Sequence, residues 1–365
     1  MEVFRRLPPP ARRQPCALTI GNFDGVHLGH QGILARLRAR ADQLGLPVCV
    51  LTFEPHPRDY FAARAAAAAR SDAAGGASAG ASATAAPAAA APTAGAPATA
   101  PTAPLPSAPA RIYTERDKLE ALAACGVDRV CIAHFNASLA ALSAEQFIDQ
   151  ILIDGLQTRY LLVGDDFRFG ARRRGDFALL QTAAAQHGFE LARTETIMRD
   201  GVRVSSSAVR QALATGDFER AQALLGSPYY ISGRVIHGRK LGRTIGFPTL
   251  NLRIPFVHPA VSGVFVVRVH GLRDTPLPGV ASLGTRPAVE ADGRLLLEVH
   301  LFDFNENIYG RRIRVEFVHK LRDEANFASL ELLTAQIDRD AQAARRWFAE
   351  HPPGGDAPIR GAGSG

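Results

Sequence analysis

One decapeptide carries the strongest sign of chemistry in this sequence, Gly21-Asn-Phe-Asp-Gly-Val-His-Leu-Gly-His30. It follows a short apolar run, Cys16 to Ile20, and opens an amphipathic segment, which predicts a strand, a tight loop and a helix N-terminus. A helix N-terminus presents free N–H groups and a partial positive charge, so it suits phosphate. His27 and His30 are three residues apart, so both imidazoles can point at one phosphoryl group.

The loop of this decapeptide contains glycines, which let a backbone approach a ligand closely. The spacing His27-Leu-Gly-His30 resembles the signature of nucleotidylyltransferases, in which such imidazoles donate hydrogen bonds to charge developing on phosphates. The structural alternative is a glycine-rich turn with two surface histidines, and the strand–loop–helix context favours the binding interpretation. We therefore expect phosphate or nucleotide contacts from Gly21, Asn22, Phe23, Asp24 and Gly25.

Composition limits the possible classes of protein. The 365 residues are enough for two domains, and no apolar run reaches the ~20 residues of a membrane span. The net charge of +7 fits ATP and phosphorylated substrates as ligands. The sequence has no basic stripe interleaved with aromatic residues, so we do not expect nucleic acid as a partner. The first residues lack the apolar core of a secretory signal. Four cysteines without metal-ligand spacing predict reduced thiols in a cytoplasmic protein, Cys16, Cys49, Cys125 and Cys131.

Residues 1–225 alternate between strand and helix patterns, which predicts a Rossmann-like domain with a doubly wound parallel sheet. The expected helices after the decapeptide are 115–125, 143–156, 176–187, 206–214 and 217–225, and the expected strands are 47–53, 127–134, 159–164 and 189–197. Residues 62–110 differ, because they are mostly Ala, Pro, Thr, Ser and Gly. We expect a disordered insertion there, briefly helical at most over residues 65–69.

Residues 226–350 show a different pattern, with alternating or β-branched runs separated by turn residues. The expected strands are 229–236, 263–269, 277–283, 295–304 and 311–321. Several strands with almost no helix predict an antiparallel barrel or sandwich. An amphipathic pattern over 327–350 predicts a terminal helix, and the Pro/Gly-rich residues 351–365 are expected to be a disordered tail.

Two further motifs follow expected strands of the first domain. In Thr52-Phe-Glu-Pro-His-Pro57, His56 lies where ligands of open sheets bind, although a rigid turn with an exposed histidine is equally compatible. In Val163-Gly-Asp-Asp-Phe-Arg-Phe-Gly170, Asp165 and Asp166 suit a ribose, an adenine or Mg²⁺, and Phe167 and Phe169 suit a ring. A strand-end loop with two core phenylalanines is the simpler interpretation of that motif alone. The next three residues, 172–174, are arginines and are expected to form a solvated basic turn.

Serines gather at the start of the expected helix 206–214. Ser205, Ser206 and Ser207 leave hydroxyl and N–H groups for a triphosphate, and Arg210 lies one turn further along. A plain helix cap needs only one serine, so this run favours phosphate binding.

The second domain has its own basic, glycine-rich segment, residues 237–251. It lacks the spacing of a P-loop, but its backbone and its cations suit phosphate, from Gly238, Lys240, Gly242 and Arg243. Thr249 and Asn251 alternate, so in an extended segment their oxygens face one side and suit Mg²⁺ shared with phosphate. A flexible hairpin loop is the alternative.

A carboxylate interrupts the apolar run 295–304. Glu298 shares a strand face with His300 and suits the deprotonation of a hydroxyl for attack on a γ-phosphate. For a lone glutamate, an exposed strand face is the usual explanation.

Together these blocks resemble the bacterial bifunctional riboflavin kinase/FAD synthetase family, and they occur in the family's order. The matching blocks are 21–30, 52–57, 142–147, 163–170, 204–210, 246–251, 298–304 and 309–311. The resemblance implies a C-terminal riboflavin kinase barrel, in which Glu298 is the base and Thr249 and Asn251 hold Mg²⁺ and phosphates. Leu250 stands where alanine is more usual, which leaves both of those residues in place.

For the first domain, the resemblance implies an FMN adenylyltransferase. His27 and His30 would meet the phosphates of ATP, Asp166 would contact nucleotide, and residues 205–210 would grip the triphosphate. His56 and Phe167 are the expected flavin contacts. The implied ligands are ATP, riboflavin, FMN, FAD and Mg²⁺, with a monomer or a weak homo-oligomer. The alternatives are an FMN adenylyltransferase whose barrel only binds flavin, and a basic nucleotide- or nucleic-acid-binding scaffold without enzymatic activity.

Overall fold

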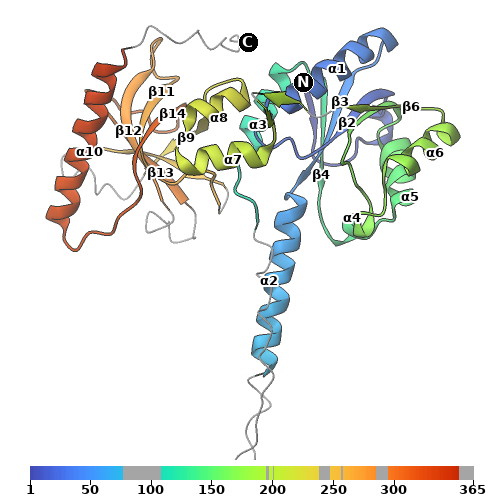
Figure 1. Ribbon diagram of the computed structural model, residues 1–365, viewed down its shortest axis with the longest axis horizontal. Helices are drawn as coiled ribbons and strands as arrows, with labels where there is room; N and C mark the ends of the chain where they lie inside the picture. Colours follow the sequence, from blue (N-terminus) through green and yellow to red (C-terminus); the bar gives the residue numbers. More distant parts are fainter. Residues whose placement is uncertain are drawn as a thin grey trace, which may run out of the picture.

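A layered α/β unit and a β-barrel make up the chain in the computed structural model (Figure 1). The structure describes residues 1–76, 108–194, 197–199, 201–237, 247–255, 258–284 and 295–352. Both parts of the expected fold class are therefore confirmed. Among the described helices, none combines the length and the apolar character that crossing a membrane requires.

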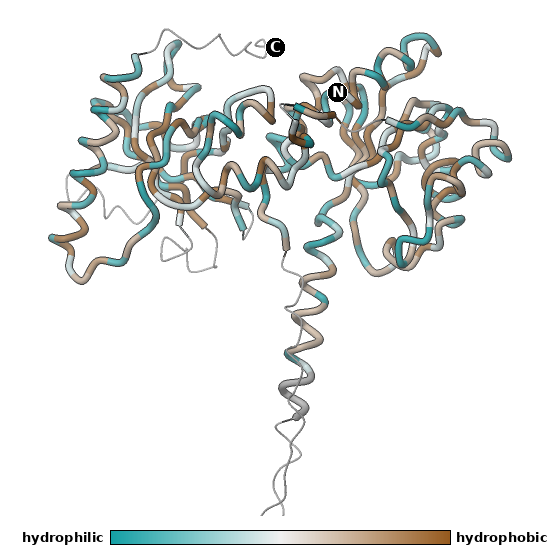
Figure 2. The backbone as a smooth tube through the Cα atoms, in the orientation of Figure 1, coloured by the Kyte–Doolittle hydropathy of each residue, from teal (hydrophilic) through white to brown (hydrophobic). Residues whose placement is uncertain are grey.

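The N-terminal sheet has six parallel strands in the order β1-β4-β3-β2-β5-β6. Their bounds are β1 Glu2–Phe4, β2 Cys16–Ile20, β3 Val48–Glu54, β4 Arg129–His134, β5 Thr158–Gly164 and β6 Glu190–Thr194. Every residue of β2 is buried, as expected for a central parallel strand covered on both faces. Figure 2 shows these strands as a hydrophobic centre within the unit. Three cysteines belong to this core, and all four in the chain are free thiols.

Helices and short turns connect and cover these strands. They are η1 Pro10–Arg12, α1 Leu28–Leu44, α2 Pro57–Gly76, α3 Glu115–Ala124, α4 Ala137–Ala141, α5 Ala144–Phe147, η2 Ile148–Gly155, η3 Ala171–Arg173, α6 Phe177–His187, α7 Ser206–Thr215 and α8 Phe218–Leu225, with a small hairpin of β7 Met198–Arg199 and β8 Val202–Arg203. Left-handed glycines end α1, α6, α7 and α8. The ends of α6, α7 and α8 agree with the expected boundaries to within one residue.

The expected single α-helix over 143–156 is wrong in its second half. Its capping box is confirmed, since Ser143 Oγ accepts from Gln146 N at 3.1 Å and Gln146 Oε1 accepts from Ser143 N at 2.9 Å. After Phe147 the chain continues as η2, a wider π-helical segment. Its last turn closes with Leu156 N donating to Ile151 O at 3.0 Å, five residues back. Ile148, Ile151 and Leu152 are buried along this segment.

The expected disorder of 62–110 is wrong for residues 62–76, which continue α2. Alanine has the highest helix propensity of all residues, so this stretch forms a helix without burying an apolar face. Figure 1 shows α2 projecting away from both units. Residues 77–107 of the expected insertion and residues 353–365 of the expected tail lie outside the described residues.

The C-terminal unit is a closed antiparallel barrel, not a sandwich, in the order β10-β13-β12-β11-β14-β9. Its bounds are β9 Tyr230–Ile236, β10 Leu250–Ile254, β11 Gly263–His270, β12 Leu277–Leu283, β13 Leu295–Leu301 and β14 Arg312–Arg322, followed by the terminal helix α10 Leu330–Glu350. The sequence pattern indicated all of these except β10, which directly follows the glycine-rich basic segment. Helix α10 packs on the outside of the barrel through Ala341 and Ala344.

Elements of the first unit pack directly against the barrel. The ring of Phe218 on α8 lies 5.8 Å from that of Phe265 and 6.0 Å from that of Phe317, measured between centroids. On α3, the buried carboxylate of Asp117 accepts a hydrogen bond from Ser232 N of β9 at 3.2 Å and another from the Ser232 hydroxyl. The boundary that we expect after residue 225 separates the two sets of strands, but α8 shares its core with the barrel.

Candidate active sites

Strands β2 and β5 are neighbours, but the chain leaves them in opposite directions, toward β3 and toward β6. Ligands of open parallel sheets bind at such a switch point, beyond the carboxyl ends of the strands. A cavity of about 900 Å³ opens there. It is lined by twelve of the expected site residues, Gly21, Asn22, Phe23, Asp24, His30, His56, Asp166, Phe167, Ser205, Ser206, Ser207 and Arg210. The lining does not include His27 or Gly25.

His27 and His30 form a stacked pair at the start of α1. Their ring centroids are 3.8 Å apart with 19° between the planes. His27 is the N-cap residue, and its Nδ1 accepts a hydrogen bond from His30 N at 3.4 Å. As the sequence predicts, both histidines lie at the start of α1, His27 as its N-cap and His30 on its first turn. In the structure His27 lies behind His30, which faces the cavity.

Both imidazoles are held neutral by their surroundings. Burial lowers the pKa of His27 to about 4, and the positive charge of Arg210 adds to the effect. Burial also lowers the pKa of His30 well below its usual value, with further contributions from His27, Lys118 and Arg210. A neutral imidazole keeps one N–H donor at physiological pH. Two buried polar atoms at the cavity have no hydrogen-bond partner among the described residues, His30 Nδ1 and Asn22 Oδ1.

The loop between β2 and α1 has a strained backbone. Phe23 and Val26 have φ values of 49° and 40°, in the left-handed region that β-branched and bulky side chains disfavour, and Gly25 between them has φ 86°. At Gly29, a Cβ atom would lie 3.0 Å from the His27 ring and 3.2 Å from Val204 O. Strain of this kind concentrates at ligand sites, where the surroundings impose it.

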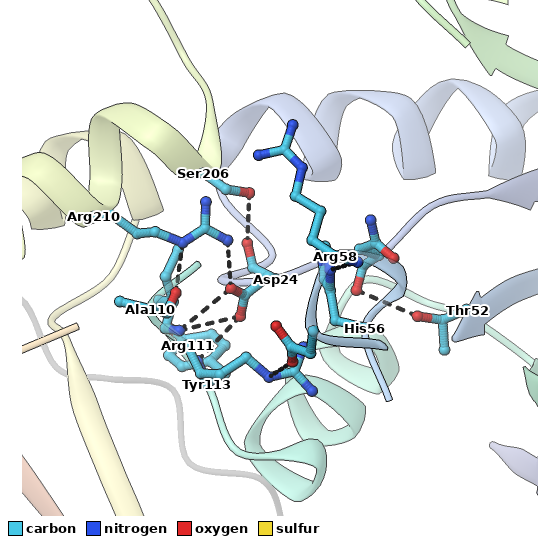
Figure 3. Close-up of polar contacts among 12 residues, drawn as sticks. Asp24, Thr52, His56, Arg58, Ala110, Arg111, Tyr113, Ser206 and Arg210 are labelled. Atoms are coloured by element: carbon cyan, nitrogen blue, oxygen red, sulfur yellow. Dashed lines mark hydrogen bonds and ion pairs between the residues drawn. The ribbon is translucent and has the colours of Figure 1, made fainter. Parts of the chain in front are cut away.

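Asp24 anchors neighbouring groups in the structure (Figure 3), and the nucleotide contact that we expect from it stays a prediction. Its buried carboxylate accepts hydrogen bonds from the backbone N–H groups of Ile112 and Tyr113 and pairs with Arg210 Nη2 at 2.8 Å. Its carbonyl oxygen accepts from the Ser206 hydroxyl at 3.0 Å. These bonds fix the position of Arg210 at the cavity.

The N-terminus of α7 faces the same cavity. Ser205 caps this helix by accepting a hydrogen bond from Ala208 N at 3.2 Å, while Ser207 is exposed. Arg210 Nε donates to Ala110 O at 2.6 Å, and its Nη2 donates to Asp24. Neither of these two hydrogen bonds uses Nη1. The helix terminus and this arginine together suit a polyphosphate.

Three other residues that we expect to contact flavin or nucleotide lie in surroundings that differ from one another. His56 is buried, its Nδ1 accepts from Arg58 N at 3.1 Å, and burial lowers its pKa to about 3 (Figure 3). Phe167 stacks on Phe169 with 5.5 Å between centroids. Asp166 is 76% exposed and pairs with Arg203 at 3.1 Å. All three residues remain predictions as ligand contacts.

Lys118 on α3 is a buried polar residue beside the site that the sequence motifs do not indicate. It is 5% exposed, and its Nζ donates to Thr52 Oγ1 at 3.2 Å, which in turn donates to Asn22 O at 3.3 Å. A single lysine on a helix gives no sequence signal, because only the fold brings it beneath the 21–23 loop. An aromatic group at the cavity was also missed, in which Phe61 and Phe135 lie 5.8 Å apart.

In the barrel, Asn251 of β10 lies directly opposite Glu298 of β13, and Ser282 of β12 is the partner on the other side. Their strand neighbours Leu252 and Leu297 belong to the core, so alternation places Asn251 and Glu298 together on the outer face. The expected kinase residues are therefore adjacent. The expected phosphate contacts Gly238, Lys240, Gly242 and Arg243 lie outside the described residues.

Thr249 directly precedes β10 and lines a second cavity of about 240 Å³. Val235, Val299 and Tyr309 are among its other lining residues, so this cavity lies at one end of the barrel. Tyr309 stacks on His237 with 3.6 Å between centroids. Among the residues described, no group of three His, Cys, Asp or Glu side chains forms a metal site.

Comparisons with known proteins match both units. The family model of FAD synthetase matches residues 10–71 and 96–208, and that of riboflavin kinase matches residues 225–348. The bifunctional riboflavin kinase/FMN adenylyltransferase of Escherichia coli strain K12 is 45% identical over 94% of this chain and 96% of its own. The protein of the same description from Pseudomonas fluorescens is 44% identical over 90% of this chain and 92% of its own. A crystal structure described as a macrolide-efflux protein from Streptococcus pneumoniae has a TM-score of 0.64 and 26% identity, covering 94% of this chain and 98% of that one.

Proposed function

Because this chain belongs to the family of bifunctional riboflavin kinases/FMN adenylyltransferases, we propose that it converts riboflavin to FAD in two steps. The barrel transfers the γ-phosphate of ATP to the riboflavin 5′-hydroxyl, which gives FMN. The sheet unit joins FMN to the AMP part of ATP and releases pyrophosphate. The observation that carries the proposal is that each unit has its own polar centre, the His27–His30 stack and the Asn251–Glu298 pair.

In the adenylyl transfer, a phosphate oxygen of FMN attacks the α-phosphorus of ATP while the bond to the pyrophosphate oxygen breaks. The neutral imidazole of His30 faces the cavity and donates an N–H to a phosphate oxygen, and His27 supports it by stacking. The N-terminus of α7 and Arg210 bind the other phosphate oxygens. These fixed donors stabilise the charge that develops on the leaving pyrophosphate without having to reorganise.

In the phosphoryl transfer, Glu298 accepts the proton of the riboflavin hydroxyl as that oxygen attacks the γ-phosphorus of ATP. Asn251 is its neighbour across the strand pair, so an amide oxygen and a carboxylate share one face of the barrel. Oxygen ligands are those that Mg²⁺ prefers, so this donor set fits the ion. We propose that Thr249 and Asn251 hold Mg²⁺, which neutralises phosphate charge when it is bound.

The first experiment incubates the purified chain with riboflavin, ATP and Mg²⁺ and separates the flavins over time. FMN that appears first and is then converted to FAD supports both activities. FAD formed from added FMN, but no product from riboflavin, would leave an adenylyltransferase whose barrel only binds flavin. No flavin product from either substrate would contradict the proposal. We also propose a cytoplasmic location, where the four cysteines stay as thiols.

A further inference from the structure

The loop after β5 is fixed at both ends. Phe169 N donates to Gly175 O at 3.2 Å, and Gly175 N donates to Phe169 O at 2.9 Å, which closes the loop. Ala171 N donates to Leu142 O at 2.7 Å, and a Cβ on Gly170 would lie 2.7 Å from the backbone of Ala144. The short turn of three arginines between these anchors therefore has little freedom to move.

Two of these arginines have an unfavourable backbone conformation. Arg172 has φ 55° and Arg173 has φ 58°, so two consecutive non-glycine residues lie in the left-handed region. Arg174 has φ −73° and ψ −27°, which is ordinary helical geometry. A glycine would adopt the first two conformations without strain. Strained residues persist where something other than backbone preference retains them, and they concentrate at ligand sites.

The carboxylates of this region are already paired with other arginines. Asp166 pairs with Arg203 at 3.1 Å, and Asp176 pairs with Arg168 at 3.1 Å. Asp165 lies 3.9 Å from Arg193. In the described part of the chain, the side chains of the first two loop arginines form no ion pair or hydrogen bond. Both arginines are exposed, so their positive charge is available to a group outside the protein.

The direction of the three side chains differs as well. Arg172 and Arg173 line the 900 Å³ cavity, together with His30 and Arg210. Arg174 does not line it, and its charge acts instead on Glu145, whose pKa is lowered first by hydrogen bonds and also by this arginine. The strained and unpaired arginines are thus the ones that reach the cavity, on the side of the switch point that follows β5.

We propose that Arg172 and Arg173 form a second phosphate-binding element of this cavity, in addition to the histidines and the N-terminus of α7. A guanidinium group binds phosphate oxygens in pairs, and no bond to the protein forms or breaks. The cavity must hold two phosphorylated molecules, ATP and FMN, and either can supply the phosphate. This inference rests on the proposed adenylyltransferase activity.

Glycine variants test the proposal sharply, because they remove the strain and the charge together. In the double variant R172G/R173G, the KM of FAD formation for ATP or for FMN should rise about tenfold, the scale of losing hydrogen bonds to a charged group. The thermal midpoint should rise by a few degrees, since glycine accepts a positive φ. R174G is the matched control, with unchanged KM values and a lower thermal midpoint. The rate of FMN formation from riboflavin should stay the same in all of these variants.

The two substrates separate the possible sources of the phosphate. A higher KM for ATP alone assigns the arginines to the triphosphate, and a higher KM for FMN alone assigns them to the flavin phosphate. The lysine variant R172K/R173K keeps the charge without the paired geometry and should recover part of the affinity. Unchanged KM values for both substrates in the double glycine variant would overturn the proposal. If the wild type forms no FAD, the proposed function itself fails, which is a different result.

Discussion

At the scale of single residues, the account depends on a histidine pair that the fold keeps neutral. His27 is both a helix cap and a stacking partner of His30. Asparagine is also a good N-cap, so the variant H27N keeps the cap but loses the imidazole. We expect kcat for FAD formation to fall by about a hundredfold, because His30 loses the stacking partner that holds its N–H donor in place, and a misplaced donor costs about as much as a lost one. The rate of FMN formation should not change.

The control for this variant is H187N on α6, where the histidine is only loosely paired with Asp149 at 3.3 Å. Its two activities should match those of the wild type. Equal rates of FAD formation in H27N and in the wild type would show that this imidazole contributes nothing to the chemistry.

The same histidine makes stability depend on pH. The pKa of His27 is lowered to about 4 in the folded chain, against about 6.5 in an unfolded one, so the unfolded state binds the proton first. The contribution of the neutral imidazole to the free energy of unfolding is therefore fully present above pH 6.5 and is lost as the pH falls toward 4. About 2 kcal/mol of it should be gone by pH 5.

Denaturant unfolding at pH 7 and at pH 5 measures this dependence. The free energy of unfolding of H27N should change less between the two pH values than that of the wild type. Burial lowers the pKa of His56 to about 3. The free energy of unfolding of the variant H56N should therefore also change less between pH 7 and pH 5 than that of the wild type. Parallel pH curves for H27N and the wild type would contradict the buried neutral state of His27.

The sequence identified many single residues of the site, because motifs such as His27-Leu-Gly-His30 combine chemistry with local geometry. It did not predict the anchoring contacts of Asp24, whose partners at residues 112, 113 and 210 are distant in sequence. It did not identify Lys118, since burial of a helical lysine is a property of the fold. Residues that act through long-range contacts need the structure.

At the scale of elements, helix α3 connects the two units. Asp117 is fully buried and accepts hydrogen bonds from Ser232 N and from the Ser232 hydroxyl, which also accepts from Arg312 Nη2 at 2.7 Å. In S232A the carboxylate and the guanidinium both lose a partner inside the protein. The free energy of unfolding should fall by about 1–3 kcal/mol. Equilibrium unfolding checks this value, with S138A on the exposed face of α4 as the control. Equal stability of the two variants would mean that this contact contributes nothing.

Helix α2 leads to a second prediction about an element. Its residues 62–71 are exposed or half-buried, and the FAD synthetase model leaves residues 72–95 unmatched. Replacing residues 71–108 with a Gly-Ser linker of about ten residues should leave both activities within about twofold of the wild type, because this segment is mostly Ala, Pro, Thr, Ser and Gly and has few large apolar side chains to bury. Flavin assays and a thermal scan of the shortened chain measure this. Loss of folding in that chain would show that the segment contributes to stability.

Element types were predictable where periodicity was clear. The apolar runs indicated the central parallel strands, and glycines marked the ends of α6, α7 and α8. Strand β10 was missed because its pattern is short and follows a loop-like segment. The π-helical η2 was missed because its apolar spacing is that of an ordinary amphipathic helix and π-helical segments are rare.

At the scale of the whole molecule, one hydrophobic core crosses from the sheet unit into the barrel. It includes Leu34 and Val50 of the first unit together with Phe265 and Phe317 of the barrel, and Phe218 of α8 lies between them. A shared core couples the unfolding of its two sides. We therefore expect one thermal transition, in which the two activities are lost together.

Calorimetry combined with residual assays after heating measures this coupling. Retention of FMN formation at a temperature that abolishes FAD formation would show that the barrel is stable on its own. The sequence predicted two sets of strands and a boundary near residue 225. It did not predict that α8 packs on the barrel, because the packing of a helix between two units depends on both surfaces.

The central claim is that two separate centres catalyse two consecutive steps. The most direct test compares E298Q, H27N and an equal mixture of the two, each supplied with riboflavin, ATP and Mg²⁺. We predict no FMN from E298Q, which still makes FAD from added FMN, and FMN with very little FAD from H27N. The mixture should form FAD from riboflavin. FMN formation by E298Q at the rate of the wild type, or no FAD from the mixture, would contradict the account.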